Sequence, residues 1–142
     1  MRHTIVIGLL GCACDKKKQM AQLLSAHGGE LVSYDKWVQG VYQQEQSILY
    51  VDFNENVPLD RIQELRLCND VDKYVWLDDM AEDVHCRAGL DELEKKRQMF
   101  YRKIADQRVV MSVKDNHVEW VGRKIAECIF AYRDFLLIQN GV

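Results

Sequence analysis

Short apolar runs alternate with stretches of helical spacing along the chain. The runs lie at residues 4–10 (TIVIGLL), 31–32 (LV), 47–53 (SILYVDF), 74–77 (YVWL) and 109–113 (VVMSV). Continuous apolar, β-branched runs of this length are typical of strands that are covered on both faces of a parallel sheet. The pattern therefore predicts five strands, the first of which begins close to the N-terminus.

Helices are predicted between these strands. Met20, Leu23 and Leu24 recur at helical spacing after Lys17, and Gly28 ends that stretch. Further helices are predicted from Asp35, after Pro58, over residues 90–105, and after a capping box formed by Asn116 and Glu119. Strands that alternate with helices imply crossover connections, so we predict an α/β fold: a three-layer α/β/α sandwich with a mostly parallel, about five-stranded sheet.

Size and composition narrow the class of protein. A length of 142 residues suits one domain over residues 1–142, and 48% hydrophobic with 29% charged residues is an ordinary globular balance. The net charge of −3 gives no reason to expect a nucleic-acid partner or a membrane surface. No apolar run approaches the roughly 20 residues that a bilayer span needs, and the apolar N-terminal stretch is interpreted as a buried strand rather than a signal peptide.

The cysteines indicate a reducing compartment. Five cysteines, an odd number at irregular spacing, do not suggest a disulfide framework, so we expect a cytoplasmic protein. Cys12 and Cys14 form a C-x-C pair, and His85 precedes Cys86. Zinc sites normally use C-x-x-C or H-x-x-x-H pairs, so we favour small buried side chains and one exposed thiol over a metal site.

The first strand-to-helix turn carries the candidate chemistry. It reads GLLGCACDKKKQ from Gly8, whereas a working phosphate loop follows G-x-x-x-x-G-K-[ST]. If Gly11 is the first glycine of that motif, Lys16 replaces the second glycine, Lys17 is the phosphate-binding lysine, and Lys18 replaces the hydroxyl residue. We therefore take Gly8, Gly11, Lys16, Lys17 and Lys18 as candidate phosphate-binding residues.

The departures from the motif have physical consequences. A lysine at a position that needs positive φ costs about 1–2 kcal/mol, and Lys18 would repel magnesium instead of coordinating it. Asp15 places a carboxylate where phosphate charge should lie. Conversely, lysines at a helix start oppose the helix dipole by roughly 0.3–1 kcal/mol each, which an anion bound there would offset. A solvated charge run at a surface turn is the alternative interpretation.

At this point the N-terminal third resembles the dephospho-coenzyme A kinase family of phosphate-loop nucleotide kinases. That family opens with a strand, the loop G-L-T-G-G-I-G-S-G-K-S-T, a helix ending in glycine, and a strand ending in I-D-A-D. The matching text is IGLLGCACDKKKQMAQLLSAHGGELVSYDKWVQGVY over residues 7–42. Later, VDKYVWLDD is similar to the family's V-D-x-V-x-V-V-D strand. The family's large portion between Tyr42 and Ser47 is missing, and thymidylate kinase-like enzymes share the same element order.

The resemblance implies roles for two further residues. Asp35 takes the place of the family's second aspartate, a general base for the acceptor hydroxyl; its alternative role is to cap the following helix. Arg87 begins RAGL, which resembles the R-D-G-L stretch of the family's lid, where an arginine stabilises transferred charge; its alternative is a solvated arginine. Asp35 and Arg87 are thus the candidate catalytic residues.

Two functions follow from this resemblance. The first is a catalytically impaired pseudokinase that binds a nucleotide-like anion or a protein partner. The second is an active small-molecule kinase that transfers the γ-phosphate of ATP to a hydroxyl of dephospho-coenzyme A or a nucleotide, with ATP and magnesium as cofactors. Phosphoryl transfer depends on positioned charge and magnesium, so loss of the hydroxyl residue and the second glycine favours the first.

Overall fold

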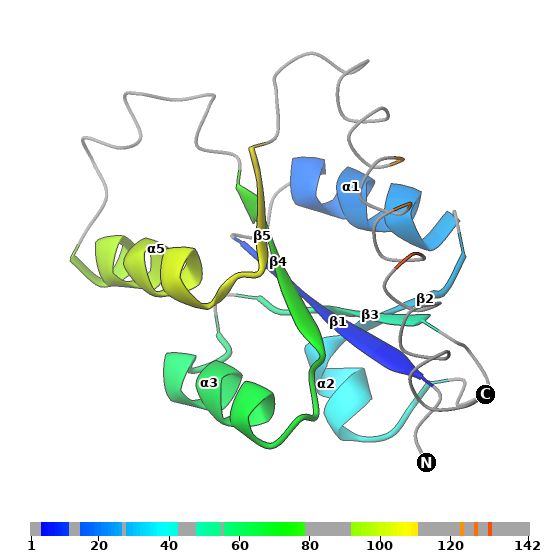
Figure 1. The fold of residues 1–142 in the computed structure, drawn as a ribbon, viewed down its shortest axis with the longest axis horizontal. Helices are drawn as coiled ribbons and strands as arrows, with labels where there is room; N and C mark the ends of the chain where they lie inside the picture. The colour runs from blue at the N-terminus through cyan, green and yellow to red at the C-terminus, as the bar shows by residue number, and fades with distance from the viewer. Residues whose placement is uncertain are drawn as a thin grey trace.

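The computed structural model describes residues 4–11, 15–26, 28–42, 48–54, 56–78 and 92–110, together with Arg123, Glu127 and Ala131. Five parallel strands form one sheet in the order β2-β3-β1-β4-β5 (Figure 1). The strands are β1 (Ile5–Leu10), β2 (Glu30–Ser33), β3 (Ile48–Asp52), β4 (Lys73–Asp78) and β5 (Gln107–Val110). The helices are α1 (Asp15–Ala26), α2 (Tyr34–Val38), α3 (Leu59–Leu67) and α5 (Glu92–Ile104).

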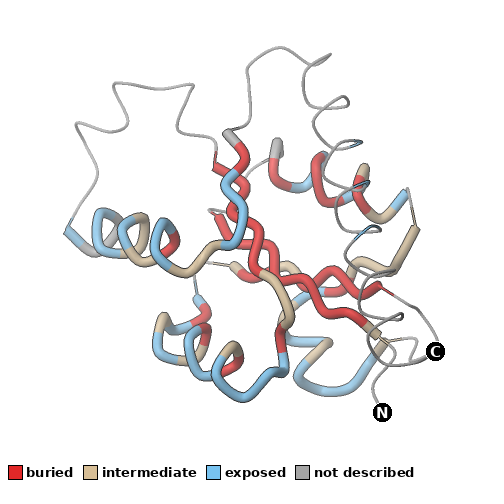
Figure 2. Tube along the Cα trace, viewed as in Figure 1, coloured by how far each residue is buried: buried red, intermediate tan, exposed pale blue. Residues whose placement is uncertain are grey.

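Helices cover both faces of this sheet. Met20, Ala21 and Leu24 of α1 pack on the face formed by Ile5, Ile7 and Leu9 and by alternate residues of the neighbouring strands. On the other face, side chains of α2, α3 and α5 pack over Val6, Leu10 and their neighbours. The predicted three-layer α/β/α sandwich is therefore confirmed, and the continuous apolar runs are explained by burial on both faces (Figure 2).

The path of the chain explains which helix covers which face. The connection from β1 runs to the edge strand β2, whereas the next three connections step back across the sheet to β3, β4 and β5. Right-handed crossovers that move in opposite directions must use opposite faces. The connection through α1 therefore lies on one face, and those through α2, α3 and α5 lie on the other (Figure 1).

Some boundaries differ from the predicted ones. The helix expected from Asp35 is the short α2, which ends at Val38 and buries none of its residues. Strand β5 begins at Gln107, two residues before the apolar run, because Val75 and Trp76 of β4 pair with Gln107 and Arg108. Tyr101 is the buried aromatic residue of α5, while Phe100 is only partly buried. In the predicted last helix, Arg123, Glu127 and Ala131 are helical, and its remaining residues lie outside the described part.

Candidate functional site

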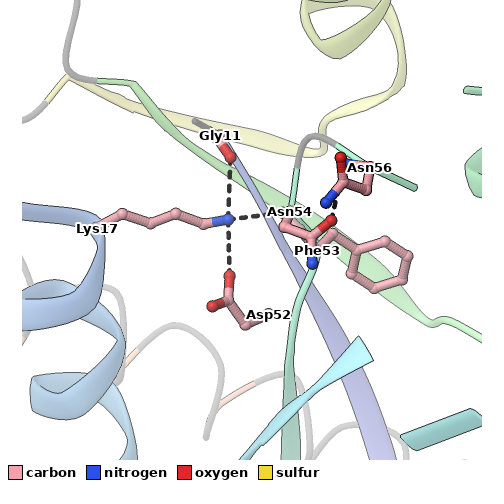
Figure 3. Close-up of polar contacts among 6 residues, drawn as sticks. All are labelled: Gly11, Lys17, Asp52, Phe53, Asn54 and Asn56. Carbon is pink, nitrogen blue, oxygen red and sulfur yellow. Dashed lines mark hydrogen bonds and ion pairs between the residues drawn. The ribbon is translucent and has the colours of Figure 1, made fainter. Parts of the chain in front are cut away.

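The ammonium group of Lys17 lies among three protein oxygens at the carboxyl end of the central strand. Its Nζ donates to the carbonyl oxygen of Gly11 at 3.0 Å and to that of Phe53 at 2.6 Å. Oδ1 of Asp52 lies 2.7 Å from the same nitrogen (Figure 3). Among the described residues, two carbonyl oxygens that accept hydrogen bonds and one carboxylate at ion-pair distance offset the burial of this ammonium group, which explains how a lysine can be only 3% exposed.

The helical periodicity of α1 directs Lys17 inward. Residues 17, 20, 21 and 24 are separated by three or four positions and so share one face of the helix, and all four are buried. Lys18 follows one position later, about 100° around the helix, and is exposed. The neighbouring lysines therefore have different environments: Lys17 faces the sheet, and Lys18 faces solvent.

The fold places this cluster where doubly wound sheets bind ligands. Strand β1 lies between β3 and β4, and the connection that leaves β1 crosses the opposite face from those that leave its two neighbours. Ligands of open α/β sheets bind at such a switch point, outside the carboxyl ends of the strands. Gly11 follows β1, and Asp52 ends β3, so these two contacts of Lys17 come from strand ends at the switch point.

Asp52 supplies a negative charge beside Lys17 in the first turn of α1. Its Oδ1 is buried against Lys17, whereas the side chain as a whole remains 46% exposed. Its backbone is fixed by pairing with Leu9 of β1 and Ser33 of β2. The unfavourable position of a lysine at a helix start thus has a local compensation: an anion from the same chain lies against Lys17.

The two candidate glycines have different roles in packing. Gly11 adopts φ +136° and is buried, and a Cβ there would lie 2.4 Å from the carbonyl oxygen of Leu77. Its place in the turn therefore requires glycine, and its carbonyl group accepts from Lys17. Gly8 instead lies inside β1, where a Cβ would approach the Tyr74 ring to 2.5 Å. Gly8 contacts the ring of a core residue, three residues before the turn.

The other candidate residues are not part of the Lys17 cluster. Asp35 is exposed in the first turn of α2, at the edge of the sheet beyond β3. The alternative role considered for Asp35, capping this helix, is wrong: Ser33 is the N-cap, and its hydroxyl accepts from the backbone nitrogen of Lys36. A side-chain cap must precede the helical residues, and Asp35 is already helical. The side chain of Lys16 and the whole of Arg87 lie outside the described residues.

A second acidic side chain ends β4. Asp78 is 2% exposed, and its Oδ2 accepts from Nε of Arg108 at 2.9 Å and from Nη2 at 2.6 Å. The guanidinium carbon of Arg108 lies 4.7 Å from the centre of the Trp76 ring, which adds a cation–π contact. This charge pair fixes the edge strand β5 to β4 at the carboxyl edge of the sheet.

The sequence pointed to Lys17 and Gly11 but not to the oxygens of Asp52, which ends β3, and of Phe53, which follows it. The signal for Asp52 is the carboxylate near the end of the apolar run SILYVDF, since strand ends at this edge face the ligand side. The Phe53 carbonyl leaves no side-chain signal. The cysteine and histidine residues considered for a metal, Cys12, Cys14, His85 and Cys86, all lie outside the described residues; Cys68 is a free, exposed thiol.

Comparisons with known proteins do not assign a family. No protein-family description matches the chain, and no significant match was found among curated proteins or among solved structures. In the part of the chain that the structure describes, no helix has the length and apolar character needed to cross a membrane.

Proposed function

We propose that this chain is a non-catalytic domain of nucleotide-kinase type that binds a phosphate-bearing, nucleotide-like anion at Lys17. The observation that carries the proposal is the position of the Lys17 ammonium group, which is buried at the switch point of the sheet, 2.7 Å from a carboxylate. The resemblance to dephospho-coenzyme A kinases supplies the ligand class. The absence of a disulfide pattern and the free thiol of Cys68 agree with a cytoplasmic location.

Two features argue against phosphoryl transfer. Transfer requires charge that is already directed at the moving phosphoryl group, whereas the Lys17 ammonium group is paired with Asp52, which an anion must first displace, and donates to two carbonyl oxygens. The next helical position, where a working loop supplies a hydroxyl for magnesium, is the exposed Lys18. A cation at that position repels a divalent metal ion.

An active kinase remains the second candidate, on one specific observation. Gly11 and Lys17, which match the motif, do lie together, with 3.0 Å between the carbonyl oxygen and Nζ. In that reading ATP and magnesium are the cofactors, Asp35 accepts the hydroxyl proton and Arg87 stabilises the phosphoryl group. Asp35 would require a substrate that spans from the edge of the sheet to the centre, because β3 separates β2 from β1.

Thermal unfolding with added ligand tests the proposal. A ligand that binds only the folded state raises the unfolding midpoint, by the equivalent of about 2.7 kcal/mol at 100 times its Kd. ATP, ADP and pyrophosphate should each raise the midpoint, with or without magnesium, and no ADP should form from ATP in the presence of dephospho-coenzyme A. ADP formation that depends on magnesium and the acceptor would establish the active kinase instead. No shift with any of these anions would refute anion binding.

A matched pair of variants assigns the effect to the site. Lys17→Met removes the buried ammonium group, whereas Lys18→Met removes an exposed charge one residue away on the same helix. The midpoint shift with pyrophosphate should disappear in the first variant and persist in the second. Equal loss in both would indicate a general electrostatic attraction rather than a site at Lys17.

A further inference from the structure

We propose that Asp52 acts as a built-in competitor for Lys17 and makes the site selective for phosphate groups of two or more negative charges. This inference rests on the proposed function and concerns the same site. The carboxylate of Asp52 occupies, with its Oδ1 2.7 Å from Nζ, the position that an anion oxygen would need (Figure 3). An incoming anion must therefore displace this group before it can contact the ammonium nitrogen.

The geometry allows that displacement without a change of fold. Asp52 is held by the backbone pairing of β3, but its carboxylate is attached through only two rotatable side-chain bonds. The side chain is 46% exposed, so rotation would carry the carboxylate toward solvent. Because the Gly11 and Phe53 carbonyl oxygens hold Nζ independently of Asp52, the ammonium group would stay in place. The position that Oδ1 now occupies, 2.7 Å from Nζ, would then be open to a ligand oxygen.

Competition with Asp52 sets a minimum charge that a ligand needs in order to bind Lys17. An acceptor tethered beside its partner acts at an effective concentration of at least about millimolar. A free monocarboxylate such as acetate offers the same kind of oxygen with the same charge, so it gains nothing over Asp52. A phosphate group with two or more charges gains Coulomb energy in proportion to its charge. Pyrophosphate or a nucleotide can therefore displace Asp52, while a monoanion cannot.

Removing the competitor should strengthen binding. In Asp52→Asn the side chain keeps nearly the same shape but loses its charge, so the ammonium group attracts an anion without an internal rival. For an ion pair with one buried and one half-exposed partner, we expect pyrophosphate to bind about five- to tenfold more tightly. Glu64→Gln is the matched control, because it removes one negative charge from a 59% exposed side chain on α3. The affinity of this variant for pyrophosphate should stay within about twofold of wild type.

The test is isothermal titration of the full chain with pyrophosphate, in EDTA and at constant ionic strength, alongside acetate. Asp52→Ser is a second variant that should shift the affinity in the same direction, and thermal unfolding confirms that each variant is folded. If wild type binds pyrophosphate and both Asp52 variants bind it equally or more weakly, the competitor role is overturned while the proposed function stands. Acetate binding to wild type as tight as that of pyrophosphate would overturn the selectivity. If neither wild type nor the variants bind pyrophosphate, the proposed function fails as well.

Discussion

The Tyr74 ring covers the Cα atom of Gly8: a methyl group built on Gly8 would lie 2.5 Å from two carbon atoms of that ring. The ring also packs edge-on against Phe53, and its hydroxyl group donates to the carbonyl oxygen of Ile62 at 2.8 Å. Tyr74 therefore cannot move aside without breaking contacts on both of its sides. The glycine that opens the turn sequence is required by the packing of the core.

We predict that Gly8→Ala destabilises the protein by about 1–3 kcal/mol, because it overpacks a filled core position. Urea unfolding measures this change. In a Tyr74→Leu background the added methyl group has more room, so the same substitution should cost less. An identical cost in both backgrounds would show that the Tyr74 ring is not the obstacle.

The contrast between Gly8 and Gly11 shows how far the sequence can be interpreted. Alternation of apolar runs and helical spacing was sufficient to predict the layered fold, because both signals arise from local geometry. A glycine, however, looks the same in sequence whether it makes room for a ring or adopts positive φ. Only the register of β1 against β4, which pairs Gly8 with Tyr74, separates the two cases.

The same limit applies to the candidate site. The spacing of Lys17 from Met20, Ala21 and Leu24 already places it on the buried face of a helix, so its inward direction could be derived from the sequence. The contacts of its ammonium group with Asp52 and Phe53 could not be derived in this way, since these residues lie more than 30 positions away in the chain and are brought close to β1 by strand pairing. For Ser33 and Asp35 the choice of helix cap depended on the first helical residue, and a boundary is poorly fixed by sequence.

Lys17→Met should destabilise the folded state by about 1–3 kcal/mol. The substitution leaves the Gly11 and Phe53 carbonyl groups without their ammonium donor in a buried place, and such groups lose their hydration without replacement. Lys18→Met should change stability by less than about 0.5 kcal/mol, because that side chain is exposed. Urea unfolding of both variants checks the prediction. Equally small changes in the free energy of unfolding would contradict the prediction that the bonds from Lys17 to the two carbonyl oxygens stabilise the fold.

Two buried tyrosines should respond in opposite ways to loss of the hydroxyl group. The Tyr50 hydroxyl is buried, with no hydrogen-bond partner among the described residues, whereas the Tyr74 hydroxyl donates to Ile62. Tyr50→Phe should therefore stabilise the protein by about 1 kcal/mol, and Tyr74→Phe should destabilise it by about the same amount. The measurement is the free energy of unfolding in urea at pH 7. Destabilisation by Tyr50→Phe would point to a partner for its hydroxyl group.

Stability should fall steeply in alkaline solution. Desolvation by burial raises the pKa of both Tyr50 and Tyr74 above the ordinary value of 10.0. The folded state thus holds two phenolic protons that the unfolded chain releases above about pH 10, and the stabilisation present below that pH is progressively lost as the pH rises. The two groups together can contribute a slope of up to about 2.7 kcal/mol per pH unit.

Unfolding midpoints between pH 9 and pH 11.5 measure this slope. The double variant Tyr50→Phe with Tyr74→Phe should show a flatter decline than wild type over that range. Parallel curves would mean that other groups cause the alkaline loss of stability.

The most direct measurement of the central claim is NMR of the lysine ammonium groups. We predict one side-chain ammonium signal that is protected from exchange with water, that is missing in Lys17→Met, and that shifts when pyrophosphate is added. A spectrum without a protected ammonium signal, or a protected signal that pyrophosphate leaves unchanged, would contradict the account of Lys17 as a buried, anion-binding cation.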